Sequence, residues 1–495
     1  MYKRQTRDDA HLLLARAAWL TGDFVGAAET IEASAGPAAA AEAALAALAA
    51  GDHLRTRRRI AEAGRDLSGL SRYARSYYHL AAGIDALLRG DVNAAMGEQA
   101  ALLAVTWQCG SPWLWWLGRL FSAQVVLAAG GADADAHVPD AKEVASQLKS
   151  PLFEFMALLT EADAARRSGA TARAVQILAR AMPIGRAHGF VNTWLWLPAM
   201  MAELAALALD ADIESEYVRQ LVRERKLVPS EPPVDAEMWP WPVKIFTLGR
   251  FEVLIDERPL RFTGKAQRKP LALLRTLVAL GGDRVREDRL TELLWPDADG
   301  DAARQALSTT LHRLRRLLGL DRAIVRADGG ISLAREHCWV DVWALERMIA
   351  RAEAAIARSP VRDHEWAAAI RWTDRAVVLY QGEFMTGEPV PEGIAGLGDR
   401  LRDRLLRQLR KMGHLWEIIG DWQEAAECYE RAVSLHDCAE EFYRRLMIAY
   451  ERLDRRGDAI LTYERCRKTL SSALGIPPSR ETEAVRRDLL SPGGC

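Results

Sequence analysis

The sequence predicts a mostly helical chain in which a small α+β module lies between two arrays of paired helices. In the first array, glycines that precede helix-like runs recur at spacings of 39, 40 and 39 residues, a period typical of stacked helix pairs. These glycines are Gly51, Gly90, Gly130 and Gly169. In the last array, Tyr429 and Tyr463 lie in matching Tyr-Glu-Arg triplets 34 residues apart. Between the arrays, short alternating runs bounded by Gly, Pro or charge predict strands.

Composition is that of a globular chain with several cores. The 495 residues are 49% hydrophobic and 27% charged, with a formal net charge of −1, so about three domains are expected. The N-terminus lacks a signal-peptide pattern, and Glu42 interrupts the alanine-rich run 37–50, so neither secretion nor a membrane partner is predicted. The six cysteines show no CxxC spacing, which favours reduced thiols in a cytoplasmic protein.

The first helical-repeat domain is predicted over residues 1–228, because this segment is rich in Ala, Leu, Arg and Glu. Residues 229–242 are rich in Pro and Trp and predict a linker. The repeat domain also holds two groups of tryptophans, Trp107, Trp113, Trp115 and Trp116 in one and Trp194 and Trp196 in the other. Core packing is the favoured interpretation. A groove for an effector, either a small molecule or a protein, is the alternative.

The central module, residues 243–338, begins with three short strand-like runs, 243–249, 251–255 and 259–262, which predict a small antiparallel sheet. Pro270 is suited to the first turn of a helix that ends at Gly281-Gly282.

A second short helix is expected over residues 287–295, with Leu290, Leu293 and Leu294 facing inward. An acidic loop, 296–301, follows, and Asp301 is suited to cap the next helix. That next helix is predicted over residues 302–318, which contain no acidic residue.

The helix predicted over 302–318 has two chemically distinct sides. One side is an apolar stripe formed by Leu307, Leu311, Leu314 and Leu318. The other side carries only donors and positive charge, from Gln305, Ser308, Thr309, His312, Arg313 and Arg316. A helix of this length spans roughly 25 Å and fits the major groove of DNA. A merely solvated face is the alternative interpretation.

A hairpin is expected after this helix, because Asp328-Gly329-Gly330 separates the strand-like runs 324–326 and 331–333. Residues 243–338 hold 18 Lys and Arg against 13 Asp and Glu, an excess of five positive charges on a near-neutral chain. A local positive excess is typical of a module that binds phosphates.

Sheet, two helices, basic helix and hairpin, in that order, make a winged helix-turn-helix. Residues 240–338 resemble the response-regulator-type winged helix of the Streptomyces antibiotic regulatory proteins (the SARP type). The resemblance rests on Leu290-Thr-Glu-Leu-Leu-Trp-Pro-Asp297 and on Ala303-Arg-Gln-Ala-Leu-Ser-Thr-Thr-Leu-His-Arg-Leu-Arg-Arg-Leu-Leu-Gly319.

Residues 339–495 resemble the bacterial transcriptional activation domain that follows the winged helix in the same family. The resembling segments are Trp339-Val-Asp-Val342, Tyr380-Gln-Gly-Glu-Phe384 and Ala473-Leu-Gly-Ile-Pro-Pro-Ser-Arg-Glu-Thr482. Residues 1–228 are similar, by period and alanine placement, to the tetratricopeptide-like repeats of MalT-type regulators. The predicted fold class is therefore mostly α, with two tetratricopeptide-like domains flanking a small α+β winged helix.

The resemblance implies a sequence-specific DNA-binding transcriptional activator. It makes Arg313 the expected base contact, with Thr309 and His312 nearby, and Ser308, Arg315 and Arg316 the expected phosphate contacts. Arg326, beside the hairpin tip, would reach a neighbouring minor groove or the DNA backbone. The 296–301 loop and the 339–490 segment would contact RNA polymerase.

No cofactor, metal or enzyme activity is predicted. A GxxxxGK[ST] phosphate loop is absent, since Gly264-Lys265 lacks both the first glycine and the following Ser or Thr. Two groups of candidate metal ligands, Asp133, Asp135, His137 and Asp140, and Asp297, Asp299 and Asp301, are interpreted as polar loops. His364-Glu365 lacks the second His of a zincin motif.

Two alternative functions stay open. The chain is also compatible with an interaction scaffold whose winged helix binds only proteins. MalT-type relatives usually carry an upstream ATPase, so the chain is also compatible with the C-terminal part of an ATP-dependent regulator.

Overall fold

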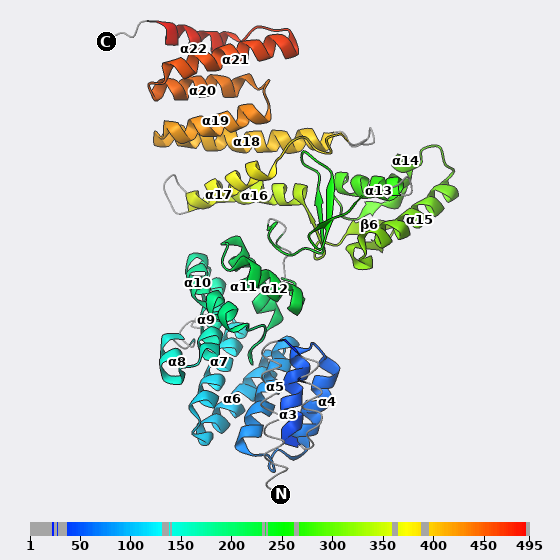
Figure 1. Cartoon of the computed structure of the whole chain (residues 1–495), viewed down its shortest axis with the longest axis vertical. Helices are drawn as coiled ribbons and strands as arrows, with labels where there is room; N and C mark the ends of the chain where they lie inside the picture. The colour runs from blue at the N-terminus through cyan, green and yellow to red at the C-terminus, as the bar shows by residue number, and fades with distance from the viewer. Residues whose placement is uncertain are drawn as a thin grey trace. The chain divides into compact units, whose positions relative to one another are not determined.

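The chain folds into two compact units, Met1–Pro240 and Trp241–Cys495, built mostly of helices (Figure 1). The computed structural model describes residues 37–130, 141–229, 236–261, 267–358, 365–387 and 396–491, together with residues 22, 23, 27, 138 and 233. The mostly helical fold class predicted from the sequence is confirmed. Among the described helices, none is long and apolar enough to cross a membrane.

The first unit is a succession of helix pairs. The helices described in this unit are α3 (Pro37–Ala49), α4 (His53–Ala63), α5 (Arg72–Leu88), α6 (Val92–Cys109), α7 (Pro112–Ala129), α8 (Ala141–Leu148), α9 (Pro151–Arg167), α10 (Thr171–His188), α11 (Pro198–Asp210) and α12 (Ser215–Arg225). The periodic glycines end α3, α5, α7 and α9, with φ angles of 72° to 81°. Glycine adopts this left-handed conformation without a Cβ clash, so the predicted period marks helix ends.

The tryptophans of the first unit divide between core and surface. Trp113 packs against Phe153 and Trp194, with ring centroids 6.3 and 6.0 Å away, and Trp116 is buried. For these residues core packing, the favoured interpretation, is confirmed. It is wrong for Trp107, which is 74% exposed and meets only the edge of Trp115 among the described aromatic rings.

The second unit begins with a four-stranded sheet in the order β3-β2-β1-β7. Its strands are β1 (Val243–Phe246), β2 (Glu252–Ile255), β3 (Arg258–Pro259) and β7 (Cys338–Val340). The first three strands are antiparallel neighbours, as predicted, whereas β7 pairs with β1 in parallel. The boundary that we predicted between residues 338 and 339 therefore falls inside a strand. Trp339 belongs to the sheet and is buried.

Three helices and a second sheet complete the central module. The helices are α13 (Arg268–Ala279), α14 (Glu287–Leu294) and α15 (Gly300–Leu318), and the strands are β4 (Val285–Arg286), β5 (Ile324–Ala327) and β6 (Gly330–Leu333). The predicted hairpin is present, because β5 and β6 pair as antiparallel neighbours. Asp328 and Gly329 at its tip both have positive φ angles, 51° and 71°, as a type I′ turn requires.

The described helices that follow stack in chain order (Figure 1). They are α16 (Asp341–Arg358), α17 (Glu365–Leu379), α18 (Gly396–Ile419), α19 (Trp422–Leu435), α20 (Glu440–Arg452), α21 (Arg456–Leu474) and α22 (Arg480–Leu490). Tyr429 and Tyr463, which carry the 34-residue period, lie at equivalent places in α19 and α21, and both are buried in one core. Large aromatic side chains at the repeat positions thus hold successive helices together.

Backbone contacts join the central module to this stack. Leu248 bridges Phe384, the Gly249 N–H donates to the Glu383 carbonyl at 2.9 Å, and the Met385 N–H donates to the Thr247 carbonyl at 2.7 Å. A Cβ on Gly249 would lie 2.8 Å from the backbone of Gln381, so this close approach requires glycine.

Candidate nucleic-acid interface

Helix α15 is amphipathic in the way that its sequence predicts. Its apolar stripe, Leu307, Leu311, Leu314 and Leu318, is at most 2% exposed and faces α13 and α14. Gln305, Thr309, His312, Arg313 and Arg316 are exposed on the opposite side, and Ser308 is half-buried. Burial of the leucines therefore fixes which side chains point outward.

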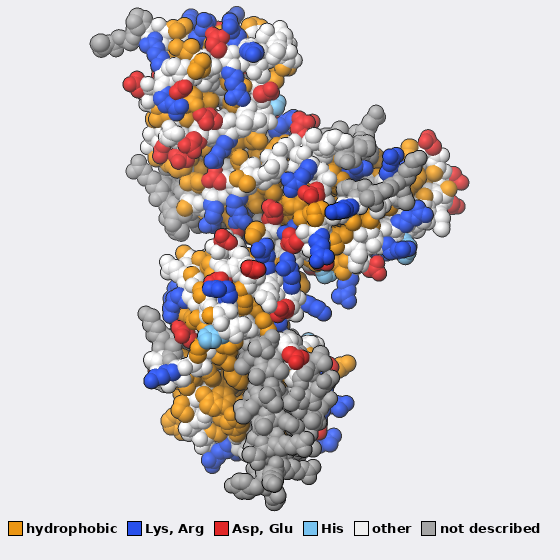
Figure 2. Space-filling model, in the orientation of Figure 1, with side chains coloured by type: hydrophobic (Ala, Val, Ile, Leu, Met, Phe, Trp, Pro, Cys, Tyr) orange, Lys and Arg blue, Asp and Glu red, His pale blue; other side chains and the backbone are white. Residues whose placement is uncertain are grey.

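The exposed side of α15 has unneutralised positive charge. Within the described residues, the side chains of Gln305, His312, Arg313 and Arg316 have no hydrogen-bond or ion-pair partner. Figure 2 shows Lys, Arg and His side chains over α15, and Asp or Glu side chains at the outer end of the module that contains α14 and α15. Guanidinium groups without internal partners keep all their donors available for an external anion or base edge.

Arg315 is used differently from its two arginine neighbours. It is half-buried, and its Nε and Nη2 donate to the carbonyl of Ile324 at 3.3 and 2.9 Å. This contact ties the end of α15 to the start of β5. The structure thus gives Arg315 a bracing role inside the module that the sequence did not indicate. Its predicted phosphate contact remains a prediction.

Arg326 lies at the centre of a polar latch between the hairpin and two helices. Its Nε and Nη2 donate to the two carboxylate oxygens of Glu287, each at 2.6 Å, and its Nη1 donates to the Ser308 hydroxyl at 3.2 Å. The latch joins β5, the first turn of α14 and the middle of α15. To reach DNA as predicted, Arg326 and Ser308 would have to share or exchange these partners.

The latch predicts a pH-dependent contribution to stability. Hydrogen bonding from Arg326 holds the pKa of Glu287 below its ordinary value of 4.5. A lowered folded-state pKa means that the stabilisation is present above pH 4.5 and is lost as the carboxylate is protonated below it. Because the Arg326 side chain is 41% exposed, we expect Arg326→Met to cost only about 0.5–1 kcal/mol at neutral pH.

Denaturant unfolding of the full chain and of Arg326→Met, at pH 7 and pH 3.5, tests the latch. The difference in unfolding free energy should shrink at the lower pH. An equal difference at both pH values would mean that the Glu287 charge contributes nothing.

The start of α15 differs from the prediction. The N-cap residue is Asp299, and its side chain makes no capping hydrogen bond. Asp301, which we expected to cap the helix, lies inside its first turn, 3.5 Å from Arg304. The helix begins two residues earlier than predicted because Gly300 and Asp301 already adopt helical geometry. A carboxylate in the first turn still favours the helix through its dipole.

The 296–301 segment lies at the surface. All six residues from 296 to 301 are exposed, and no metal-binding group of three or more His, Cys, Asp or Glu occurs among the residues that the structure describes. Asp133, Asp135, His137, Asp140, Gly264, Lys265 and His364 lie outside the described residues.

Two residues that shape the interface escaped sequence reasoning. Glu287 pairs with a residue 39 positions away, and Asp341 accepts hydrogen bonds from Thr247 and Leu248, more than 90 positions away. A local pattern contains no trace of either pairing. The one usable indication was that Glu287 opens the short helix predicted over residues 287–295, where helix starts favour carboxylates.

Comparisons with known proteins find similarity to bacterial transcriptional regulators. Residues 340–490 match the family model described as "Bacterial transcriptional activator domain". The chain is 26% identical to the regulatory protein AfsR of Streptomyces griseus over 49% of its own length and 24% of that protein. It is 24% identical to the transcriptional regulator RedD of Streptomyces coelicolor, over 44% of the chain and 65% of the relative.

Among solved structures, a complex of Mycobacterium tuberculosis EmbR with a low-affinity phosphopeptide matches half of the chain and 65% of its own, at 24% identity and a TM-score of 0.38. The chain thus spans about a quarter of AfsR and about two thirds of RedD and EmbR. Residues 340–490 match the activator domain, and over about half of its length the chain is similar to SARP-type bacterial transcriptional regulators.

Proposed function

We propose that this transcriptional regulator is an activator that binds double-stranded DNA in a sequence-specific way through α15. The observation that carries the proposal is the row of exposed donors, Gln305, His312, Arg313 and Arg316, that have no partner within the described residues. A helix side rich in donors and cations complements the acceptor-rich edge of guanine and the phosphates beside it.

Each side chain of α15 has a proposed task. Arg313 contacts a base edge, with Thr309 and His312 beside it, because all three are exposed on the same side of the helix. Arg316, one turn from His312, neutralises a phosphate. Ser308, Arg315 and Arg326 hold the helix to the hairpin in the free protein, and we propose that Ser308 and Arg326 turn to the DNA backbone when it arrives.

The domain division supports this assignment of tasks. We propose that residues 1–228 form the repeat domain that receives an effector and that 229–242 are a linker. Residues 243–338, extended by β7 to Val340, bind DNA, and the helices from α16 onward form the activation domain. Because the chromosome is the target, the proposed place of action is the cytoplasm.

Activation is proposed to work through contact with RNA polymerase. The exposed acidic segment 296–301 comprises the turn before α15 and the first two residues of that helix, where a bound duplex would leave it beside the DNA. Its aspartates complement a basic surface on the polymerase. The activation domain supplies the remaining contact area.

Selection of bound sites from random duplexes tests DNA recognition, and transcription by purified RNA polymerase from a promoter that carries the selected site tests activation. We expect enrichment of one motif and increased transcript. No enriched motif, with weak and salt-insensitive DNA binding beside tight protein partners, would favour the interaction scaffold.

A further inference from the structure

Helix α6 of the first unit carries apolar side chains on its outer side. Met96, Ala100, Ala104 and Trp107 are exposed, Met96 to 50% and Trp107 to 74%. At roughly 100° of turn per residue, these four positions fall within about 80° of one another and form one stripe, the α6 stripe. Figure 2 shows hydrophobic side chains gathered over α6 and α7. A helix that is apolar on every side is usually covered on every side.

Polar side chains in the middle of α6 are used inside the first unit. The Glu98 carboxylate lies 2.7 Å from Nδ1 of His79 in α5, and Gln99 donates to the Ser122 hydroxyl of α7. Glu98 is the only charged residue in the sequence of α6, so the α6 stripe itself is uncharged. The usual arrangement of a surface helix, with polar side chains outward and apolar ones inward, is therefore partly reversed.

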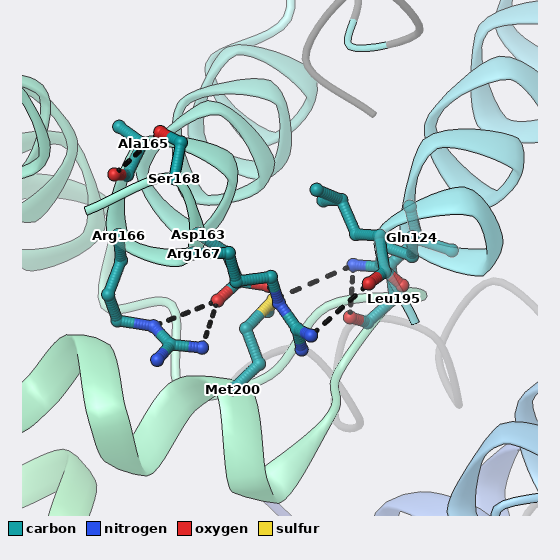
Figure 3. A network of polar contacts seen from close by, with 9 residues as sticks. Gln124, Asp163, Ala165, Arg166, Arg167, Ser168, Leu195 and Met200 are labelled. Carbon is teal, nitrogen blue, oxygen red and sulfur yellow. Dashed lines mark hydrogen bonds and ion pairs between the residues drawn. The ribbon is translucent and has the colours of Figure 1, made fainter. Parts of the chain in front are cut away.

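Helix α7, which packs beside α6, is fixed in turn by polar contacts with other parts of the first unit (Figure 3). Gln124 of α7 donates to the Leu195 carbonyl at 3.2 Å. Arg167 of α9 donates to the Leu127 carbonyl of α7 at 3.2 Å and to the Asp163 carboxylate at 2.7 Å. The α6 stripe thus lies on a supported surface, and binding to it would order little further backbone.

Equivalent helices of the same array are charged where α6 is apolar. Helices α4, α6 and α10 each follow one of the periodic glycines. Counted from that glycine, Arg57 of α4 occupies the place of Met96, and Arg186 of α10 occupies the place of Trp107. Both arginines are exposed. The apolar stripe is therefore specific to α6 and not a general property of the repeat, as expected for a contact surface.

The order of side chains along the α6 stripe is nearly symmetric. Large side chains, Met96 and Trp107, stand at its two ends, and small ones, Ala100 and Ala104, lie between them. If two copies of α6 met antiparallel about a two-fold axis, Met96 would face the partner's Trp107, and Ala100 would face the partner's Ala104. Such a contact requires that residue i meets residue j and that j meets i. Methionine sulfur also packs favourably on an indole ring.

We propose that the α6 stripe is a two-fold interface between two copies of this chain, with their α6 helices antiparallel. Because the stripe is uncharged, identical surfaces can meet without like-charge repulsion. Trp107, whose ring lies 5.5 Å from that of Trp115, is the anchor on each side. One pair of helices makes a small interface, so the dimer should dissociate at micromolar concentrations. The inference concerns the first unit alone and does not depend on DNA binding by α15.

Sedimentation equilibrium of the full chain over a series of concentrations tests the interface. We expect a monomer–dimer equilibrium, and Ala100→Glu should weaken the dimer by about a hundredfold or more, because each copy would bury an unpaired carboxylate. Ala179→Glu makes the same change at the equivalent exposed position of α10 and should leave dimerisation unchanged. A wild type that stays monomeric at every concentration, or a dimer that Ala100→Glu leaves intact, would overturn the proposal.

A mixture of two variants tests the antiparallel register. Ala104→Arg alone should be monomeric, like Ala100→Glu, and both variants should keep the helical circular dichroism of the wild type, since both positions are exposed and both new residues favour helices. In an equimolar mixture the new carboxylate of one chain faces the new guanidinium of the other, so heterodimers should form. Two folded variants that stay monomeric when mixed would refute the two-fold arrangement.

Discussion

Replacing Arg313 with alanine is expected to weaken binding to the selected DNA site by about 1–3 kcal/mol while random DNA is bound almost as before. Arg313 is exposed, and it follows His312 on the side of α15 that the buried leucines turn outward. The loss should be selective because a guanidinium pairs with the two acceptors of guanine, and a phosphate cannot replace that pattern. The measurement is a titration of both duplexes at two salt concentrations.

Two further arginine variants serve as comparisons for Arg313→Ala. Arg316→Ala should weaken binding to selected and random DNA alike. It should also reduce the slope of the logarithm of the binding constant against the logarithm of salt concentration by about one, as expected for a phosphate contact. Arg400→Ala removes an exposed arginine from α18 and should change neither affinity. If Arg313→Ala lowered both affinities equally, the base contact would have to be assigned to another side chain of α15.

Sequence patterns predicted the parts of this interface that depend on helix periodicity and on turn geometry. Four leucines at helical spacing determine which side of α15 is buried, so the outward side followed from the sequence. The Asp328-Gly329 turn needs two positive φ angles, and the sequence supplies residues that tolerate them. The glycine period marked helix ends for the same reason.

Contacts between distant segments could not be predicted in this way. The pairing of β1 with β7 joins Val243 to Cys338, and the residue pattern of neither strand indicates which strand it pairs with. The engagement of Arg315 by the Ile324 carbonyl depends on the turn that folds β5 back along α15. A cavity in the first unit is lined by residues of α3, α4, α5, α11 and α12 and of the 191–197 segment, so no window of sequence contains it.

Asp341 is expected to be the most sensitive polar residue of the second unit. Its carboxylate accepts hydrogen bonds from the Thr247 N–H, from the Thr247 hydroxyl at 2.6 Å, from the Leu248 N–H at 2.7 Å and from the Val342 N–H at 2.8 Å. It is 1% exposed. The residue thus ties the end of β1 to the first turn of α16.

Asp341→Ala should lower the unfolding free energy of the second unit by about 3 kcal/mol or more, because it leaves several buried donors without an acceptor. Hydrogen exchange of the peptide over residues 243–249 provides a local measurement, since the Thr247 and Leu248 amides would lose protection. Asp91→Ala is the control: Asp91 is an exposed N-cap in the first unit, and its loss should leave this peptide unchanged.

Titration of Asp341 gives the same contact a pH signature. Burial raises the pKa of Asp341 to about 6, against the lowering effect of its four hydrogen bonds. A raised folded-state pKa means that the folded protein takes up a proton before the unfolded chain does, so this contribution to stability is greatest below pH 4 and is lost as the pH rises through 6. Asp341→Asn removes the titrating group.

The stability gap between wild type and Asp341→Asn should therefore be wider at pH 5 than at pH 7.5. Denaturant unfolding of both proteins at the two pH values measures it. If the gap were constant, the carboxylate would be ionised in both conditions, and the four donors would outweigh the cost of burying its charge.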